Sequence, residues 1–309
     1  MTSKHLSIPF LFLAFLAVRP LDAASEAPPD GAEAVARRID IGGFYLSVAC
    51  LGKGRPTVIL DHGIGSSSRD WRHVQRGLAS TTRVCSYDRA GYGQSDPGPE
   101  PRTSSRIASE LRTLVDRAEL PPPYLLAGHS FGGYNMRAFA ELYPDETAGL
   151  VLVDSPHEEQ ADRFFQTEAM RRLDPHGSLQ YLWESEILGS LSAIDLKPFA
   201  RLLGPRSASM QGIFGEIAGF AESSRELRSF SNHDKLPVVV IAHGQRVLAG
   251  GGALSDQLED QWLSLQKELA SRFKHHRFIV AEHSGHNIPL EQPDLVIDAI
   301  KRLILELRP

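Results

Sequence analysis

The chain is constrained most by a Gly-His-Ser-Phe-Gly segment at residues 128–132. It follows an apolar run at 124–127 that indicates a buried strand, and it precedes a stretch of helical spacing at 134–142. A G-x-S-x-G sequence between a strand and a helix is typical of a sharp turn that exposes a nucleophilic serine. The flanking glycines leave room for strand and helix to approach, so we expect a positive φ at Ser130.

Strand-like and helix-like segments alternate on both sides of this turn. A hairpin at 37–51 is expected first. Buried strands are then indicated at 57–60, 84–87, 148–153, 238–242 and 277–281, and helical spacing recurs at 71–78, 104–118, 256–273 and 295–307. This alternation predicts an α/β fold with a mostly parallel sheet and helices on both faces.

Residues 157–233 interrupt the alternation. The segment has no clear strand and carries short helical pieces with many aromatic side chains. We interpret it as a helical cap inserted in a core that comprises residues 37–156 and 234–309. The aromatic side chains are expected mainly to pack the cap on the core, and some of them to line a pocket.

Residues 1–24 have the layout of a secretory signal peptide. Lys4 and His5 precede an apolar run at 6–18, and small residues follow at 23–25. That run is too short for a comfortable membrane span, so we expect no stable membrane anchor. The sequence therefore predicts a periplasmic or secreted protein with a flexible linker at 25–36, the alternative being an uncleaved anchor or a disordered tail.

Composition excludes one class of partner. The 309 residues are 42% hydrophobic and 23% charged, which is a globular composition. A chain of this length can form one large core, or a core with a cap. The formal net charge of −5 provides no basic surface for nucleic acid. We find no metal-ligand spacing and no phosphate-binding loop. We therefore expect a small-molecule substrate, no cofactor and no metal, whereas the oligomeric state stays open.

Four motifs, in this order, resemble those of the α/β-hydrolase family over residues 37–307. They are His62-Gly63 after one strand, the turn at 89–95, the serine turn at 130, and Ser284-Gly285-His286 after the last strand. The resemblance implies an eight-stranded sheet whose second strand is antiparallel to the rest. It also implies a cap between strands six and seven, and a triad in the chain order Ser, acid, His.

A serine hydroxyl needs a base to become a nucleophile, and the base needs an orienting group. Ser130 is the candidate nucleophile. His286 is the candidate base, because it lies after the last strand in a Ser-Gly-His-x-x-x-x-Glu-x-Pro run that resembles the family pattern. His283 is its rival and is expected to be structural or to lie at the rim.

The triad acid has more than one candidate. Many relatives place an aspartate after strand seven, but the loop at 243–250 contains no carboxylate. Another branch of the family places the acid after strand six. There Asp154 stands at the carboxyl edge of the sheet, where active-site groups of such folds lie. Asp256 and Asp260 are the alternatives, and Asp154 would then be only a turn residue.

An oxyanion hole requires two backbone donors. One is the N–H after the nucleophile, at Phe131, and the resemblance implies that the other is the N–H of Ile64. The resemblance also makes the strands of Cys50 and Cys85 neighbours, so a disulfide and two buried thiols both stay open. Structural roles are expected for His62, His129, Asp88 and Arg89.

These residues predict a serine hydrolase that cleaves a carboxylic ester or lactone of a small, largely apolar substrate through an acyl-enzyme. An aminopeptidase or a cofactor-free perhydrolase on the same fold is an alternative, since one triad serves several chemistries. A ligand-binding protein with the hydrolase fold and no turnover is an alternative of another class.

Overall fold

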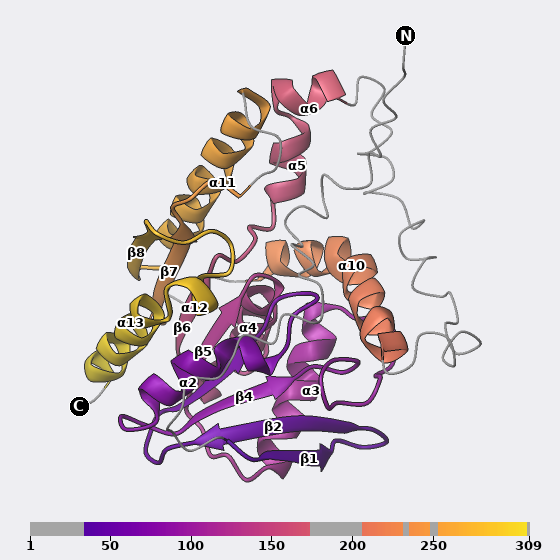
Figure 1. The fold of residues 1–309 in the computed structure, drawn as a ribbon, viewed down its shortest axis with the longest axis vertical. Helices are drawn as coiled ribbons and strands as arrows, with labels where there is room; N and C mark the ends of the chain where they lie inside the picture. Colours follow the sequence, from indigo (N-terminus) through magenta and orange to yellow (C-terminus); the bar gives the residue numbers. More distant parts are fainter. Residues whose placement is uncertain (1–33, 174–205, 231–234, 248–252, 308–309) are drawn as a thin grey trace.

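A computed structural model of the chain describes residues 34–173, 206–230, 235–247 and 253–307. In it, eight strands form one sheet in the order β1-β2-β4-β3-β5-β6-β7-β8 (Figure 1). Strand β2 is antiparallel to β1 and β4, and the other neighbours pair in parallel. The strands are β1 (Ala36–Asp40), β2 (Tyr45–Leu51), β3 (Thr57–Asp61), β4 (Val84–Asp88), β5 (Tyr124–His129), β6 (Thr147–Val153), β7 (Pro237–His243) and β8 (His275–Ala281).

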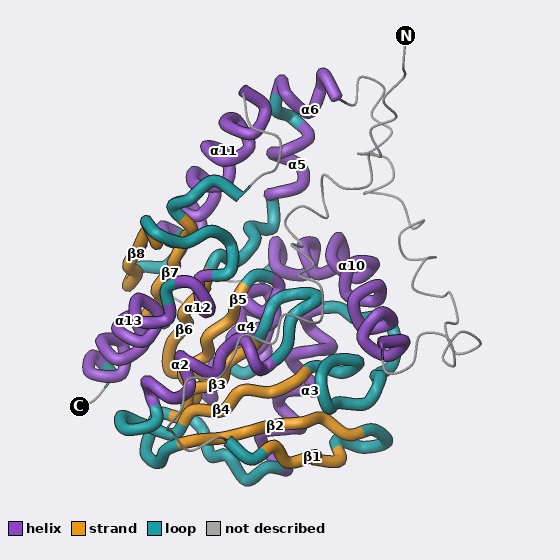
Figure 2. The backbone as a smooth tube through the Cα atoms, viewed as in Figure 1, coloured by secondary structure: helices purple, strands orange, loops and turns teal. Residues whose placement is uncertain are grey.

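Helices lie on both sides of this sheet (Figure 2). The predicted helix at 71–78 starts earlier, as a 3-10 turn. The helices are η1 (Ser68–Trp71), α2 (Arg72–Leu78), α3 (Ser104–Arg117), α4 (Phe131–Leu142), η2 (Pro144–Glu146), α5 (Gln160–Phe165), α6 (Glu168–Leu173), α10 (Arg206–Ser229), α11 (Ala253–Ser271), α12 (Ile288–Glu291) and α13 (Pro293–Glu306).

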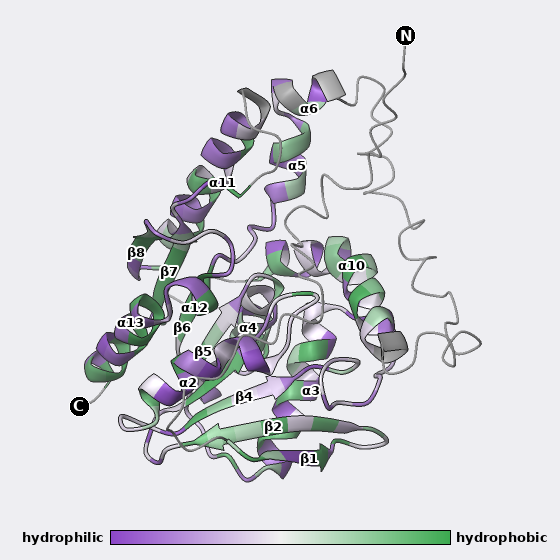
Figure 3. Ribbon diagram, in the orientation of Figure 1, coloured by the Kyte–Doolittle hydropathy of each residue, from purple (hydrophilic) through white to green (hydrophobic). Residues whose placement is uncertain are grey.

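Successive side chains of the central strands point to two separate cores. Leu126 and Leu150 belong to the core on the side of α3, α4 and α11. Leu125 and Val151 belong to the core on the side of α2 and α13. Both faces of these strands are therefore buried, which explains their continuous apolar runs (Figure 3). The predicted α/β fold is confirmed.

Helices α5, α6 and α10 lie between β6 and β7 in the chain, within the segment that the sequence analysis interprets as a cap, and the cap itself stays a prediction. Helix α10 contacts α3 and α4, whereas α5 and α6 contact α11. The rest of the predicted cap, 174–205 and 231–234, lies outside the described residues, as do the predicted signal peptide and the linker up to residue 33. Strand β1 begins within the last residues assigned to that linker. Among the described helices, none combines the length and the apolar content that a membrane span requires.

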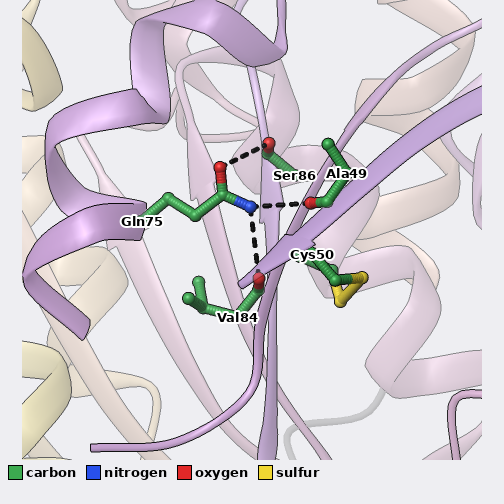
Figure 4. The surroundings of a disulfide bond; sticks show 6 residues. Ala49, Cys50, Gln75, Val84 and Ser86 are labelled. Carbon is green, nitrogen blue, oxygen red and sulfur yellow. Dashed lines mark hydrogen bonds between the residues drawn. A yellow bond between two sulfur atoms is a disulfide. The ribbon is translucent and has the colours of Figure 1, made fainter. Parts of the chain in front are cut away.

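The two cysteines form a disulfide between β2 and β4. Cys50 and Cys85 are register partners in the antiparallel pair, with a Cα–Cα distance of 4.1 Å. Beside the bridge, the Gln75 side-chain amide donates to the carbonyl oxygens of Ala49 (2.6 Å) and Val84 (3.2 Å), so α2 is tied to both strands (Figure 4). Of the two alternatives left open by the sequence, the structure has the bridge.

Candidate active site

Ser130 occupies the turn between β5 and α4 with φ 52° and ψ −128°, which confirms the expected positive φ. Its N–H donates to the carbonyl of Val153 at 2.9 Å, which holds the turn against the end of β6. Residues 124–140 are all buried except Ser130, which is partly exposed. A left-handed backbone at a non-glycine residue stores strain, and such strain is concentrated at functional sites.

Two glycines allow this turn to form. A Cβ on Gly128 would lie 2.3 Å from the carbonyl oxygen of Gly132. A Cβ on Gly132 would lie 2.5 Å from the carbonyl oxygen of Asp61 at the end of β3. Any larger side chain would therefore push α4 away from β5 or β3.

Asp154 and His286 are brought together at the same edge of the sheet, although they are far apart in the chain. The His286 Nδ1 lies 2.6 Å from the Asp154 Oδ2. Asp154 follows β6 with φ 47° and is fully buried, whereas the His286 side chain keeps 10% of its exposure. Because Nδ1 donates to the carboxylate, the other ring nitrogen of His286 is the one able to accept a proton.

The loop that carries His286 is fixed on both sides. His129, the residue before the serine, donates its Nε2–H to the carbonyl of His286 at 2.8 Å. Burial, with the charge of His286 adding to it, lowers the pKa of His129 to about 3, so this ring is neutral. Glu291 accepts from the Ser284 hydroxyl (2.9 Å) and the Gly285 N–H (2.7 Å), which explains the spacing of the Ser-Gly-His-x-x-x-x-Glu run.

The rival residues lie elsewhere. Asp256 pairs with Arg246, and its side chain is 44% exposed. Asp260 and His283 are exposed. The structure thus brings Asp154 into contact with His286, while the catalytic role of Asp154 stays a prediction.

The sequence interpretation missed two residues that contact Asp154 and a third that contacts one of them. The Asp154 Oδ2 also lies 2.7 Å from the Nδ1 of His243, at the end of β7. The Asp154 Oδ1 accepts from the His243 N–H (3.0 Å) and the Trp262 indole N–H (3.0 Å). On the far side of His243, Nε2 lies 2.8 Å from the Oε2 of Glu259.

Helical periodicity in α11 could have identified Glu259. Its buried face carries Leu258, Glu259, Trp262 and Leu265, which recur at the three- and four-residue spacing of an α-helix. Glu259 is thus a carboxylate on an otherwise apolar inner face, whereas the neighbouring Asp260 is exposed. A buried carboxylate is costly unless it has a partner, and His243 is that partner.

The loop after β3 passes directly beside the serine. A Cβ on Gly63 would lie 3.1 Å from the Cβ of Ser130. The Gly63 carbonyl accepts from Arg89 Nη2 at 3.2 Å, so the Ile64 N–H of the same peptide points away from the guanidinium. Phe131 is the first residue of α4, where an N–H has no partner within the helix. Two backbone donors thus adjoin Ser130, and their predicted oxyanion role remains a prediction.

Arg89 connects this loop to the cap, a link that the sequence did not reveal. Its Nε and Nη2 donate to Glu216 of α10 at 2.6 and 2.7 Å, and its Nη1 also pairs with Asp61. The Tyr92 hydroxyl donates to Glu216 at 2.8 Å. Burial disfavours the charge of Arg89, but Asp61 and Glu216 keep its pKa well above the ordinary value. Arg89 therefore braces its turn, as predicted, and also anchors α10.

One aromatic side chain of α10, Phe220, packs on the start of α4. The rings of Phe220 and Phe131 stack with their centroids 5.5 Å apart. The centroids of Phe220 and Tyr134 lie 5.2 Å apart. The cap thus places an apolar surface beside one of the two candidate oxyanion donors.

Asp154, His243 and His286 also have the composition of a metal site. Among the described residues, their potential ligand atoms lie within 4.8 Å of one another. Each of these atoms is already engaged in a hydrogen bond within the group. A metal ion would therefore have to displace both Nδ1 protons, and the predicted absence of a metal remains a prediction.

Comparison with known proteins agrees with this architecture. The structure is similar to a thermophilic esterase from Thermogutta terrifontis (TM-score 0.60, 22% identity, covering 89% of this chain and 100% of that one). It is also similar to the haloalkane dehalogenase DatA from Agrobacterium tumefaciens C58 (TM-score 0.61, 18% identity, covering 90% and 98%).

The sequence matches known proteins over most of its length. It is 25% identical over 250 residues to the uncharacterized protein YqjL of Bacillus subtilis (strain 168), covering 81% of this chain and 83% of that protein. A model described as the alpha/beta hydrolase family matches residues 58–299. The chain therefore belongs to the alpha/beta hydrolase family.

Proposed function

We propose that this protein is a serine hydrolase that cleaves a carboxylic ester or lactone of a small, largely apolar substrate through an acyl-enzyme. The proposal rests mainly on Ser130, the partly exposed residue of a buried segment, at the sheet edge where Asp154 binds His286. The fold alone does not select this chemistry, since an esterase and a haloalkane dehalogenase share it. A serine at the strained turn favours acyl transfer.

In the first step, the Ser130 Oγ attacks the carbonyl carbon of the substrate and its proton moves to the Nε2 of His286. Asp154 accepts the Nδ1–H of that ring and stabilises the imidazolium that forms. The carbonyl π electrons move to oxygen, and the N–H groups of Phe131 and Ile64 hold the resulting oxyanion.

In the second step, the oxyanion re-forms the carbonyl and the bond to the leaving oxygen breaks. His286 gives its Nε2 proton to that oxygen, so an alcohol departs and an acyl group stays on Ser130. Water then attacks the acyl carbon while His286 takes its proton. The bond to Ser130 breaks, its oxygen recovers the proton, and the carboxylic acid leaves.

Two features support the proposed substrate class and location. The stacked Phe220 and Phe131 give the cap an apolar surface beside the serine turn, which suits an apolar acyl or alcohol group. The Cys50–Cys85 disulfide suits an oxidising compartment, so a periplasmic or secreted location is part of the proposal.

Labelling with a fluorophosphonate tests the proposal. We expect rapid modification of the purified protein at Ser130, no modification in Ser130→Ala, and strongly slowed modification in His286→Ala. Ser109→Ala is the matched control, because that serine is exposed on α3. A panel of p-nitrophenyl esters, lactones and amino-acid arylamides then assigns the substrate class. Absence of labelling in the wild type, or labelling that survives in Ser130→Ala, would contradict the proposal.

A further inference from the structure

A continuous chain of ionisable side chains runs from α11 to the proposed base. Glu259 lies 2.8 Å from His243, His243 lies 2.7 Å from Asp154, and Asp154 lies 2.6 Å from His286. The side chains of Glu259, His243 and Asp154 are buried. A buried donor or acceptor without a complementary partner costs free energy, so these contacts indicate which atoms carry protons.

With Asp154 and Glu259 ionised, all of these contacts are satisfied when both nitrogens of His243 carry protons. The Asp154 Oδ1 already accepts two N–H groups, and the Oδ2 faces the Nδ1 atoms of His243 and His286. Each Nδ1 must therefore donate. Glu259 Oε1 accepts the Val247 N–H at 2.7 Å and Oε2 faces the Nε2 of His243, so this nitrogen donates as well. His243 is then an imidazolium between two carboxylates.

The charges of the surroundings agree with this assignment. Burial alone would lower the pKa of His243, but the charge of Asp154 and the hydrogen bonds that the ring donates to Asp154 and Glu259 raise it to about 10. Burial alone would also raise the pKa of Asp154, yet the charge of His243 and the bonds from His243 and His286 hold it well below its ordinary value.

We infer that His243 and Glu259 are positioning residues of the proposed triad, in which Glu259 holds the His243 imidazolium and His243 fixes the Asp154 carboxylate that binds His286. The inference rests on the proposed function, because it concerns His286 as the base of Ser130. A buried carboxylate that accepts several N–H groups is held in one orientation, and so is the ring bound to it.

In the described part of the chain, the ionisable side chains that contact the ring of His243 or His286 include His129 at the end of β5, Asp154 after β6 and Glu259 on α11. His129 carries no charge near neutral pH, since burial lowers its pKa to about 3. Glu259 is therefore the group through which the charge on His243 can be changed without touching the proposed triad.

The test removes the second carboxylate from His243 and measures both the rate of the reaction and the protonation of the His243 ring. In Glu259→Gln, Asp154 stays beside His243, but the ring loses the partner that holds its other nitrogen. We expect kcat on a p-nitrophenyl ester and the fluorophosphonate labelling rate at Ser130 to fall about tenfold with little change in KM. In the ¹⁵N-histidine-labelled variant, the His243 ring should lose a proton at a lower pH than in the wild type, because one carboxylate that favours its charged form is gone.

Asp260→Asn is the matched control, because it removes one negative charge from an exposed neighbour on the same helix. We expect its kcat and the titration of its His243 ring to match those of the wild type. A wild-type kcat in Glu259→Gln, or an unchanged titration of its His243 ring, would overturn the inference. Absence of labelling in the wild type would instead refute the proposed function.

A second measurement needs no variant and no turnover. In ¹⁵N-histidine-labelled wild-type protein, the His243 ring should show two protonated nitrogens up to about pH 9, well above the ordinary range of histidine. Titration of this ring between about pH 6 and 7 would overturn the inference, whatever the labelling experiment shows.

Discussion

At the scale of single residues, the site depends on which carboxylate holds His286. Asp154 offers two oxygens, and both are occupied by N–H groups of His243, His286 and Trp262. Ser130, Asp154 and His286 could be predicted because a local motif marks the turn, and strand ends mark the sheet edge. Glu259 was missed because it acts through His243 and not by direct contact with His286.

Asp154→Asn should lower kcat by about 10⁴-fold with little effect on KM, as for other triad acids, because an amide nitrogen cannot accept the Nδ1–H groups. Steady-state hydrolysis of a p-nitrophenyl ester measures this. Asp256→Asn, which removes an acid paired with Arg246, is the control and should stay within about twofold of the wild type. If Asp256→Asn were the damaging change, Asp154 would not be the acid.

At the scale of elements, helix α10 is joined to the loop after β3 through Arg89. Figure 1 shows α10 beside α3 and α4. Glu216 on α10 binds the guanidinium of Arg89, which also donates to the Gly63 carbonyl. Helical spacing predicts such a helix. It does not predict which of its carboxylates turns inward, because the partner belongs to a turn more than a hundred residues earlier.

Glu216→Ala should destabilise the fold by about 3–5 kcal/mol, because it leaves the buried Arg89 with one carboxylate fewer. Glu222→Ala, on the same helix, removes only an exposed ion pair with Arg225 and should cost less than about 1 kcal/mol. Urea unfolding of the two variants measures both values. Equal losses would mean that the Arg89–Glu216 pair does not anchor the cap helix.

The sequence predicted element types better than element ends. The hairpin predicted at 37–51 ends at the observed last residue of β2, Leu51, since turn residues follow it. Strand β3 continues one residue further, to Asp61, because this aspartate is buried and bonded to Arg89 and Asn135. Neither partner is adjacent in sequence, so local propensity could not include it.

The strand pair β2–β4 allows a prediction about the disulfide. Cys50 and Cys85 are 35 residues apart, and closing a loop of that size stabilises a fold by about 4 kcal/mol in the chain-entropy description. A Cys50→Ala, Cys85→Ala double variant should lose about this much free energy of unfolding in urea. The mass of the untreated wild type should be about two daltons lower than its mass after reduction, because a disulfide has two hydrogen atoms fewer than two thiols. An unchanged mass on reduction would exclude the bridge.

At the scale of the whole molecule, the buried charges should make stability depend on pH. The pKa of His243 is raised to about 10 from an ordinary 6.5, so the folded state keeps a proton that the unfolded chain loses between these values. The stabilisation is complete below about pH 6.5 and is lost as the pH rises towards about 10.

The free energy of unfolding of the wild type should therefore fall more steeply than that of Glu259→Gln between about pH 7 and 9. The difference arises because Glu259 is one of the two carboxylates that raise the pKa of His243. Urea unfolding at several pH values measures it, and Asp260→Asn should follow the wild type. Parallel curves for the wild type and Glu259→Gln would show that Glu259 does not stabilise the charge on His243.

The central claim is that catalysis passes through an acyl group on Ser130. A rapid-quench experiment tests this claim directly. The wild type is mixed with an excess of a p-nitrophenyl ester and quenched in acid within milliseconds, and its peptides are mapped by mass spectrometry. The account predicts one acyl group per chain, located on Ser130, and none in Ser130→Ala. Rapid hydrolysis without acylation of Ser130, or an acyl or alkyl adduct on a different residue, would contradict it.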